Sequence, residues 1–113
     1  DFDGDGYEQT GWNLLYMHIY YADRVPVGKT LKTGDLIGHP SCEGGYSSAT
    51  HLHFARKYNG VWIAADDPEV PFNLDGWKVV SARREYDGWL VKDDKWIEAL
   101  YYSDSINAVI LSP

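Results

Sequence analysis

The sequence predicts an all-β protein: a twisted antiparallel sheet with a groove on one face, plus C-terminal β-hairpins. Three observations support this prediction. Aromatic residues make up 15% of the 113 residues, helical periodicity is weak throughout, and short β-rich segments alternate with turns that contain Gly and Pro. The hydrophobic fraction of 44% is typical of a globular chain, and the length fits one domain with a modest core.

The predicted strands are separated by connections with clear turn chemistry. Asn59-Gly60 predicts a tight hairpin turn, because this pair supplies the positive φ angles that a two-residue turn needs. A second turn is predicted at residues 92–95, where Lys, Asp, Asp and Lys follow one another. The predicted loops are residues 22–35, 39–50 and 66–76, and the predicted strands are residues 12–21, 36–38, 51–57, 61–65, 77–82, 88–91, 96–102 and 107–111.

Charge and composition argue against several classes of partner. The net charge is -7, and no run of Lys or Arg exists, so we expect no nucleic-acid partner. No apolar run approaches 18 residues, so we do not expect the chain to span a membrane. A single cysteine, Cys42, excludes an internal disulfide framework.

The segment of residues 50–54, Thr-His-Leu-His-Phe, carries the strongest candidates for chemistry. Side chains two residues apart on a strand share a face, so His51 and His53 are expected to point one way and Leu52 and Phe54 the other. Two imidazoles on one face can meet one metal ion, or one can bind the metal while the other moves a proton. The simpler alternative is a pair of hydrogen-bonded surface histidines.

The same alternation applies to the strand predicted at residues 12–21. It places Tyr16 and His18 on the outward polar face and buries Met17 and Ile19. If this strand pairs with the strand that carries the other two histidines, three histidines line one groove. Taken alone, His18 is expected to be structural.

These motifs, taken together, resemble the second half of an M23-family zinc metallopeptidase domain of the lysostaphin/LytM type. Such domains carry a Leu-Tyr-x-His-Leu strand, a Gly-x-x-Ile-Gly strand, a Gly/Ser-rich loop and then His-Leu-His-Phe. The resemblance covers about residues 7–68, and the matching segments are residues 15–19, 34–38, 44–48 and 51–54.

The resemblance implies a hydrolase that cleaves peptide bonds of peptidoglycan in the bacterial cell wall, in an extracellular, periplasmic or cell-envelope location. It implies that His53 is a zinc ligand. It also implies that His18 and His51 are the catalytic pair, which activates or orients the attacking water and stabilises the oxyanion. Tyr16 is a further candidate for substrate binding on the same face.

The sequence departs from the family pattern at the metal ligands. M23 enzymes take two further zinc ligands from an upstream His-x-x-x-Asp, but no histidine precedes His18 here. A catalytic zinc site usually has three protein ligands plus water, so His53 alone does not hold zinc tightly. We expect residues 1–113 to form a single domain, in which residues 1–68 are the M23-like core portion and residues 69–113 are an appended β extension.

Two interpretations of this departure remain open. In the first, the chain is part of a zinc peptidase, inactive in isolation, whose site is completed by an upstream segment or a second chain. In the second, it is a catalytically incomplete LytM-like module that binds cell wall or a partner protein. On the family pattern the chain begins within a hairpin whose first strand is missing, which favours the first interpretation.

The N-terminal stretch Asp-Phe-Asp-Gly-Asp-Gly is a candidate calcium loop. Asp1, Asp3, Asp5 and Gly6 occupy the places that an EF-hand loop requires, but the twelfth position is Trp12, where a bidentate Glu is expected. We therefore expect a hairpin turn rather than an EF-hand. Calcium remains a candidate ligand of the three carboxylates, in the role of a structural ion.

Tryptophans in the C-terminal half suggest a third hypothesis, a calcium-dependent carbohydrate-binding β module. Tryptophan rings stack well on sugar faces, although packing in a small β core is the more common use. The tryptophans concerned are Trp62, Trp77, Trp89 and Trp96.

Overall fold

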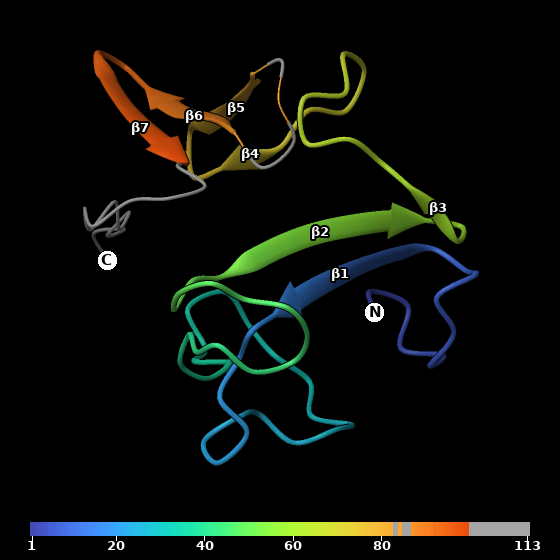
Figure 1. Ribbon diagram of the computed structural model, residues 1–113. Helices are drawn as coiled ribbons and strands as arrows, with labels where there is room; N and C mark the ends of the chain where they lie inside the picture. The colour runs from blue at the N-terminus through green and yellow to red at the C-terminus, as the bar shows by residue number, and fades with distance from the viewer. Residues whose placement is uncertain (83, 85–86, 100–113) are drawn as a thin grey trace. The chain divides into compact units, whose positions relative to one another are not determined.

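We describe the protein from a computed structural model, in which residues 1–82, 84 and 87–99 are described (Figure 1). The described residues contain no helix and form two antiparallel sheets, one of three strands and one of four. The prediction of an all-β fold, with an antiparallel sheet and C-terminal β-hairpins, is therefore confirmed. In the described part of the chain, no helix has the length and apolar character needed to cross a bilayer.

The first compact unit, Asp1–Trp62, contains the three-stranded sheet in the order β1-β2-β3. Its longest pairing joins β1 and β2, with Trp12 opposite Tyr58 and Met17 opposite His53. The turn between β2 and β3 is the predicted hairpin, because Asn59 and Gly60 have φ angles of 48° and 79°. The strands are β1 (Trp12–Met17), β2 (His53–Tyr58) and β3 (Val61–Trp62).

All four strands predicted in this part of the chain differ from the observed ones in extent or in kind. The strand predicted at residues 51–57 runs over His53–Tyr58, and the strand predicted at residues 61–65 ends at Trp62. The strand predicted at residues 12–21 ends at Met17, because His18 has a φ of 63° and turns the chain out of the extended conformation. The strand predicted at residues 36–38 does not form; this segment is part of a long connection in which Ile37 accepts a single backbone hydrogen bond from Val25. Two isolated bridges, Ile19 with Pro40 and Ser41 with His51, join that connection to the residues that follow β1 and precede β2.

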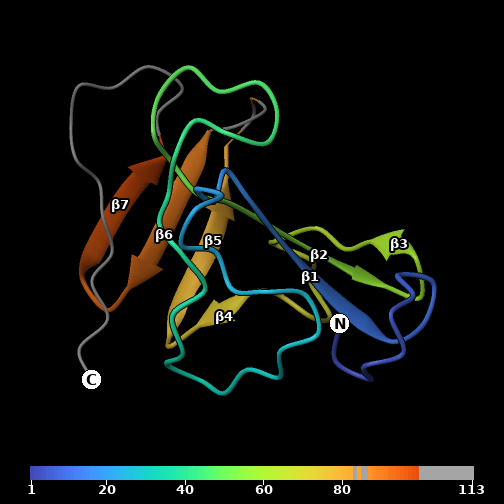
Figure 2. The ribbon, with the colours of Figure 1, turned by 90° about the horizontal axis from the view of Figure 1, so that it is seen from below.

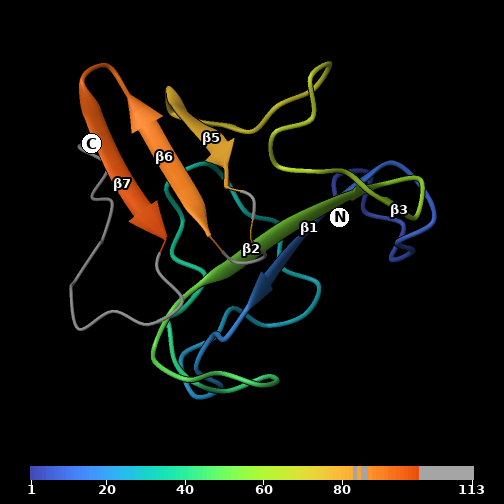
Figure 3. The same ribbon diagram turned by 45° about the horizontal axis from the view of Figure 1, so that its top comes forward.

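The second compact unit begins at Ile63 and contains the four-stranded sheet, in which consecutive strands pair (Figures 2 and 3). Phe72 and Trp77 are its buried hydrophobic residues among those described. The loop predicted at residues 66–76 contains the short strand β4, and the predicted strand at 107–111 lies outside the described residues. The strands are β4 (Asn73–Leu74), β5 (Trp77–Ser81), β6 (Gly88–Lys92) and β7 (Lys95–Ala99).

Register divides the β1–β2 sheet into two different faces, since directly opposed residues of an antiparallel pair point to the same side. One face is aromatic: the Trp12 and Tyr58 rings lie 4.9 Å apart, and the Arg56 guanidinium lies 5.5 Å from the Trp12 ring. The other face starts at His53 and continues along β2 through Ala55 to Lys57. We call this second face the histidine face.

Candidate functional site

Three histidines meet where β1 ends and β2 begins. The ring centroids of His18 and His51 lie 4.3 Å apart, and those of His18 and His53 lie 6.5 Å apart. The structure thus brings together the three histidines that the sequence predicted in one groove. We call His18, His51 and His53 the histidine cluster.

His18 is the most buried polar residue among those described, with a relative exposure of 3%, and not the outward-facing residue that strand alternation predicted. Its positive φ breaks the alternation and swings the ring into the cluster. The ring nitrogen Nδ1 lies 2.7 Å from the carbonyl oxygen of Glu43. Because a carbonyl can only accept a hydrogen bond, Nδ1 carries the proton and Nε2 is left as the acceptor.

His51 is held in the same way, but at the surface. Its Nδ1 lies 2.8 Å from the carbonyl oxygen of Ala49 and 3.3 Å from the hydroxyl of Ser47. The Ser47 hydroxyl itself donates to Ala49 over 2.6 Å. His51 therefore also carries its proton on Nδ1, and both neighbouring rings present Nε2 as a candidate proton acceptor.

Tyr16 lies on the face opposite to the one predicted. It is directly opposed to Phe54 in the β1–β2 register, and the two rings lie 4.8 Å apart. The predicted shared face was wrong because His18 reaches the cluster through its turned backbone and not through strand alternation. Burial raises the pKa of the Tyr16 phenol above its ordinary value.

The metal-binding capacity of the histidine cluster is incomplete within the described residues. The ring nitrogens of the three histidines do not gather within 4.8 Å of one another, and no carboxylate or thiol of the described chain completes a set of three with them. A catalytic zinc ion needs three protein ligands. The residues present therefore do not fit a whole zinc site, in agreement with the missing ligands noted in the sequence.

The acidic loop, residues 1–6, is the one group among the described residues whose ligand atoms do gather within 4.8 Å, through Asp1, Asp3 and Asp5. These carboxylates are exposed and accept hydrogen bonds from the loop itself. Asp1 accepts from the Gly4 and Gly6 amides over 2.9 and 2.7 Å. The calcium prediction stays a prediction, since these bonds also account for the gathering.

Asp5 has the clearest electrostatic perturbation in the acidic loop. Its carboxylate accepts a hydrogen bond of 2.5 Å from the Thr10 hydroxyl and one of 2.8 Å from the Tyr7 amide. These bonds, that from Thr10 foremost, hold the pKa of Asp5 below its ordinary value. The loop therefore favours the charged carboxylate without any bound ion.

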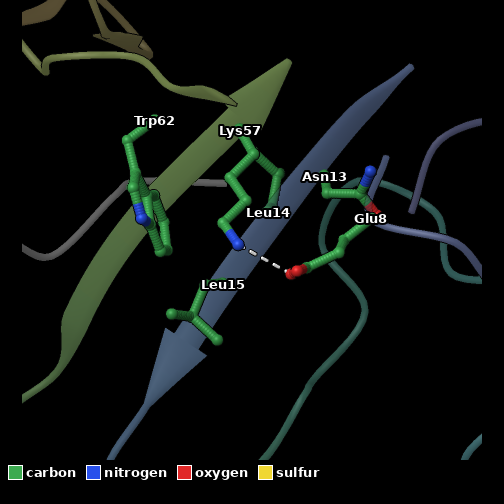
Figure 4. A pocket seen from close by; sticks show the side chains of 6 residues that line it. All are labelled: Glu8, Asn13, Leu14, Leu15, Lys57 and Trp62. Atoms are coloured by element: carbon green, nitrogen blue, oxygen red, sulfur yellow. Dashed lines mark hydrogen bonds and ion pairs between the residues drawn. The ribbon is translucent and has the colours of Figure 1, made fainter. Parts of the chain in front are cut away.

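A pocket of about 240 Å³ opens on the first sheet unit, at the far end of the histidine face (Figure 4). Lys57 pairs with Glu8 at 2.7 Å, and its ammonium lies 4.4 Å from the centre of the Trp62 ring. Since Lys57 follows His53 by four residues on one strand, the pocket lies roughly 13 Å from the histidine cluster. The lining residues are Glu8, Asn13, Leu14, Leu15, Lys57 and Trp62.

Sequence reasoning missed the pocket and the two residues that support His18. The Asn59-Gly60 turn already fixes Lys57 opposite Trp62, so the register of this hairpin was an available signal for part of the pocket. Ser41 and Glu43 gave no such signal, because they act through a loop whose path no local pattern specifies.

The tryptophans of the C-terminal half differ in how exposed they are. Trp77 is buried at 7% exposure, whereas Trp62 and Trp96 are 56% and 60% exposed. The Trp89 and Trp96 rings meet edge to face, with their centroids 6.4 Å apart. Core packing thus accounts for Trp77, while the exposed rings have the accessibility that sugar stacking requires.

Comparisons with protein-family models, with curated proteins and with solved structures give no match for this chain.

Proposed function

We propose that this chain carries the histidine part of an M23-like zinc metallopeptidase centre that cleaves peptide bonds of bacterial peptidoglycan. The observation that supports the proposal is the pair His18 and His51, whose rings lie 4.3 Å apart with both Nδ1 atoms bound to backbone carbonyls. Two adjacent imidazoles that each use Nδ1 in this way have Nε2 available for proton transfer to and from a water molecule and a leaving group.

The metal part of the centre comes, in this proposal, from outside residues 1–113. His53 is the zinc ligand that the chain contributes, and a preceding segment or a second chain contributes the others. Zinc would be bound only in that completed assembly. The resemblance implies, for such a protein, a location outside the cell, in the periplasm or in the cell envelope.

The histidine face supports a peptide as the substrate class. It continues from His53 past Ala55 and Leu15 to the pocket that contains Lys57 and Trp62. An extended peptide rises about 3.3 Å per residue, so about four residues span the distance from the cluster to the pocket. Exposed apolar and charged groups along this path are suited to the side chains of such a peptide.

The alternative function is a catalytically incomplete LytM-like module that binds cell wall or a partner protein. The incomplete zinc ligand set of the described residues favours it. The exposed Trp62, beside the Lys57 ammonium, offers it a binding surface. This alternative needs the histidine face but not the proton-accepting nitrogens of the cluster.

Hydrolysis and binding, measured side by side, distinguish the two functions. The natural protein that contains these residues is incubated with purified peptidoglycan, and released amino groups and bound protein are both quantified. The proposal predicts hydrolysis that falls at least about 100-fold in His18→Ala and in His51→Ala, with binding retained. Binding without hydrolysis by the wild-type protein would support the alternative.

A further inference from the structure

The loop of residues 41–43 holds His18 at both its backbone and its ring. The Ser41 amide and hydroxyl both donate to the carbonyl oxygen of His18, over 2.6 and 3.1 Å. The His18 ring donates from Nδ1 to the carbonyl of Glu43 over 2.7 Å. These bonds secure a φ of 63° that residues with a β-carbon rarely adopt.

The Ser41 hydroxyl closes this arrangement into a ring of hydrogen bonds. Besides donating to His18, it accepts from the Glu43 amide over 3.0 Å. Glu43 is thus placed by Ser41 at its amide, while its carbonyl receives the proton of the His18 ring. The Ser41 backbone also forms an antiparallel bridge with His51, so one residue sets the position of both imidazoles.

The Glu43 side chain ties the same loop to the chain beyond His18. Its carboxylate accepts a hydrogen bond of 2.9 Å from the Tyr21 amide. The loop is therefore attached both at the histidine that it orients and at Tyr21, three residues further along the chain, and the Glu43 carbonyl has little freedom to move away from the ring.

We propose that Ser41 is a positioning residue, which fixes His18 in the tautomer that carries its proton on Nδ1. An imidazole in water favours the opposite tautomer, with the proton on Nε2, and a hydrogen bond at one ring nitrogen determines which tautomer forms. By holding the Glu43 carbonyl against Nδ1, Ser41 keeps Nε2 of His18 available as a proton acceptor. The value of this tautomer for catalysis rests on the proposed function, whereas the tautomer itself does not.

The test is the tautomer of His18, read from long-range proton–nitrogen NMR correlations of the ¹⁵N-histidine-labelled chain of residues 1–113. Spectra are recorded at a pH high enough for the ¹⁵N shifts of the His18 ring to show the neutral form. We expect the wild type to show the Nδ1–H tautomer. In Ser41→Ala we expect the tautomer ratio to shift about fivefold towards Nε2–H, which corresponds to loss of about 1 kcal/mol.

Two variants control for the substitution itself. Ser41→Thr keeps a hydroxyl and is expected to restore the wild-type ratio. Ser48→Ala removes an exposed hydroxyl from the segment that follows this loop, and it should leave the ratio unchanged, since the bonds that hold the Glu43 backbone and carboxylate come from Ser41, His18 and Tyr21. If Ser41→Ala does not fold, Ser41→Cys provides a weaker donor of similar volume and should give an intermediate ratio.

An unchanged ratio in folded Ser41→Ala or Ser41→Cys, or a wild type in the Nε2–H tautomer, would overturn the inference. Absence of peptidase activity with the Nδ1–H tautomer intact would instead overturn the proposed function. The two failures are therefore distinguishable, because the tautomer is measured without substrate or metal.

Discussion

The histidine cluster and the acidic loop are two regions of one compact unit that both gather metal-ligand side chains, and they do so in opposite ways. In the cluster, a buried His18 and its neighbour His51 have each committed Nδ1 to a carbonyl of a surrounding loop. In the acidic loop, exposed carboxylates converge and accept hydrogen bonds from their own short turn. Ligand atoms that lie close together therefore do not by themselves mark a site for chemistry. The oriented ring nitrogens of the histidine cluster are the stronger indication.

The largest expected difference between the regions is their tolerance of a β-carbon at a glycine. A β-carbon at Gly38 would lie 2.5 Å from Cγ2 of the buried Ile19, at a φ of 143°. At Gly4, with a φ of 73°, it would meet nothing within 4 Å. We expect Gly38→Ala to lower the free energy of unfolding of the first unit by about 2–4 kcal/mol, and Gly4→Ala by about 1 kcal/mol.

Urea denaturation followed on the amide NMR signals of β1 and β2 measures both glycine variants. Equal losses of stability in the two would show that the connection around Gly38 is as loosely packed as the acidic loop. That outcome would contradict the close packing of Gly38 against Ile19, the residue that follows His18.

Within the histidine cluster, we expect a smaller difference in stability between the His18→Ala and His51→Ala variants. His18→Ala removes a buried ring and leaves the Glu43 carbonyl without its donor, so the free energy of unfolding should fall by about 2–3 kcal/mol. His51→Ala, at an exposed position, should cost less than about 1 kcal/mol. The same denaturation experiment applies, and a His51 variant as unstable as the His18 variant would contradict the assigned burial.

In the acidic loop, the effect of Thr10 on Asp5 is expected to be modest and pH-dependent. Because the folded-state pKa of Asp5 is lowered, its stabilising contribution is present above the unfolded-state pKa and is lost as the pH falls through the folded value, below about pH 4. Thr10→Val removes the main cause and should raise the pKa of Asp5.

An NMR titration of the aspartate carboxyl carbons checks this prediction, with Thr30→Val as the matched control at an exposed site outside the loop. The pKa of Asp5 should rise in Thr10→Val and stay unchanged in Thr30→Val. The same Asp5 pKa in wild type and Thr10→Val would show that the Thr10 hydroxyl does not hold the carboxylate.

The smallest effect concerns the calcium predicted from the sequence. Calcium should shift the amide signals of Gly4 and Gly6 and leave those of the histidine cluster unchanged, and Asp3→Asn should weaken the response. If Asp3→Asn responds as the wild type does, the shifts report general ionic screening and the calcium prediction is wrong.

Local sequence patterns predicted those features that depend on neighbouring residues, such as turns and strands. Asn59-Gly60 correctly predicted the hairpin. Strand alternation applies to His53, the first residue of β2, but not to His51, which precedes the strand. The same alternation failed at His18, since one residue with positive φ ends the strand and reverses the expected burial. It also misplaced Tyr16, whose face followed from the erroneous extension of that strand.

Long-range contacts explain what the sequence did not predict. The support that Ser41 gives to His18 joins residues 23 positions apart, from the amide and hydroxyl of Ser41 to the backbone carbonyl of His18. The salt bridge between Glu8 and Lys57 joins residues 49 positions apart. Neither contact has a residue pattern of its own, so each follows only from the path of the folded chain.

The zinc content of the natural protein that contains these residues, measured by mass spectrometry with a His53→Ala variant beside it, tests the proposed peptidase centre most directly. The account predicts one zinc ion per chain in the wild type and a loss of at least about tenfold in zinc affinity in the variant. Unchanged zinc stoichiometry and affinity in His53→Ala, or no zinc in the wild-type protein, would contradict it.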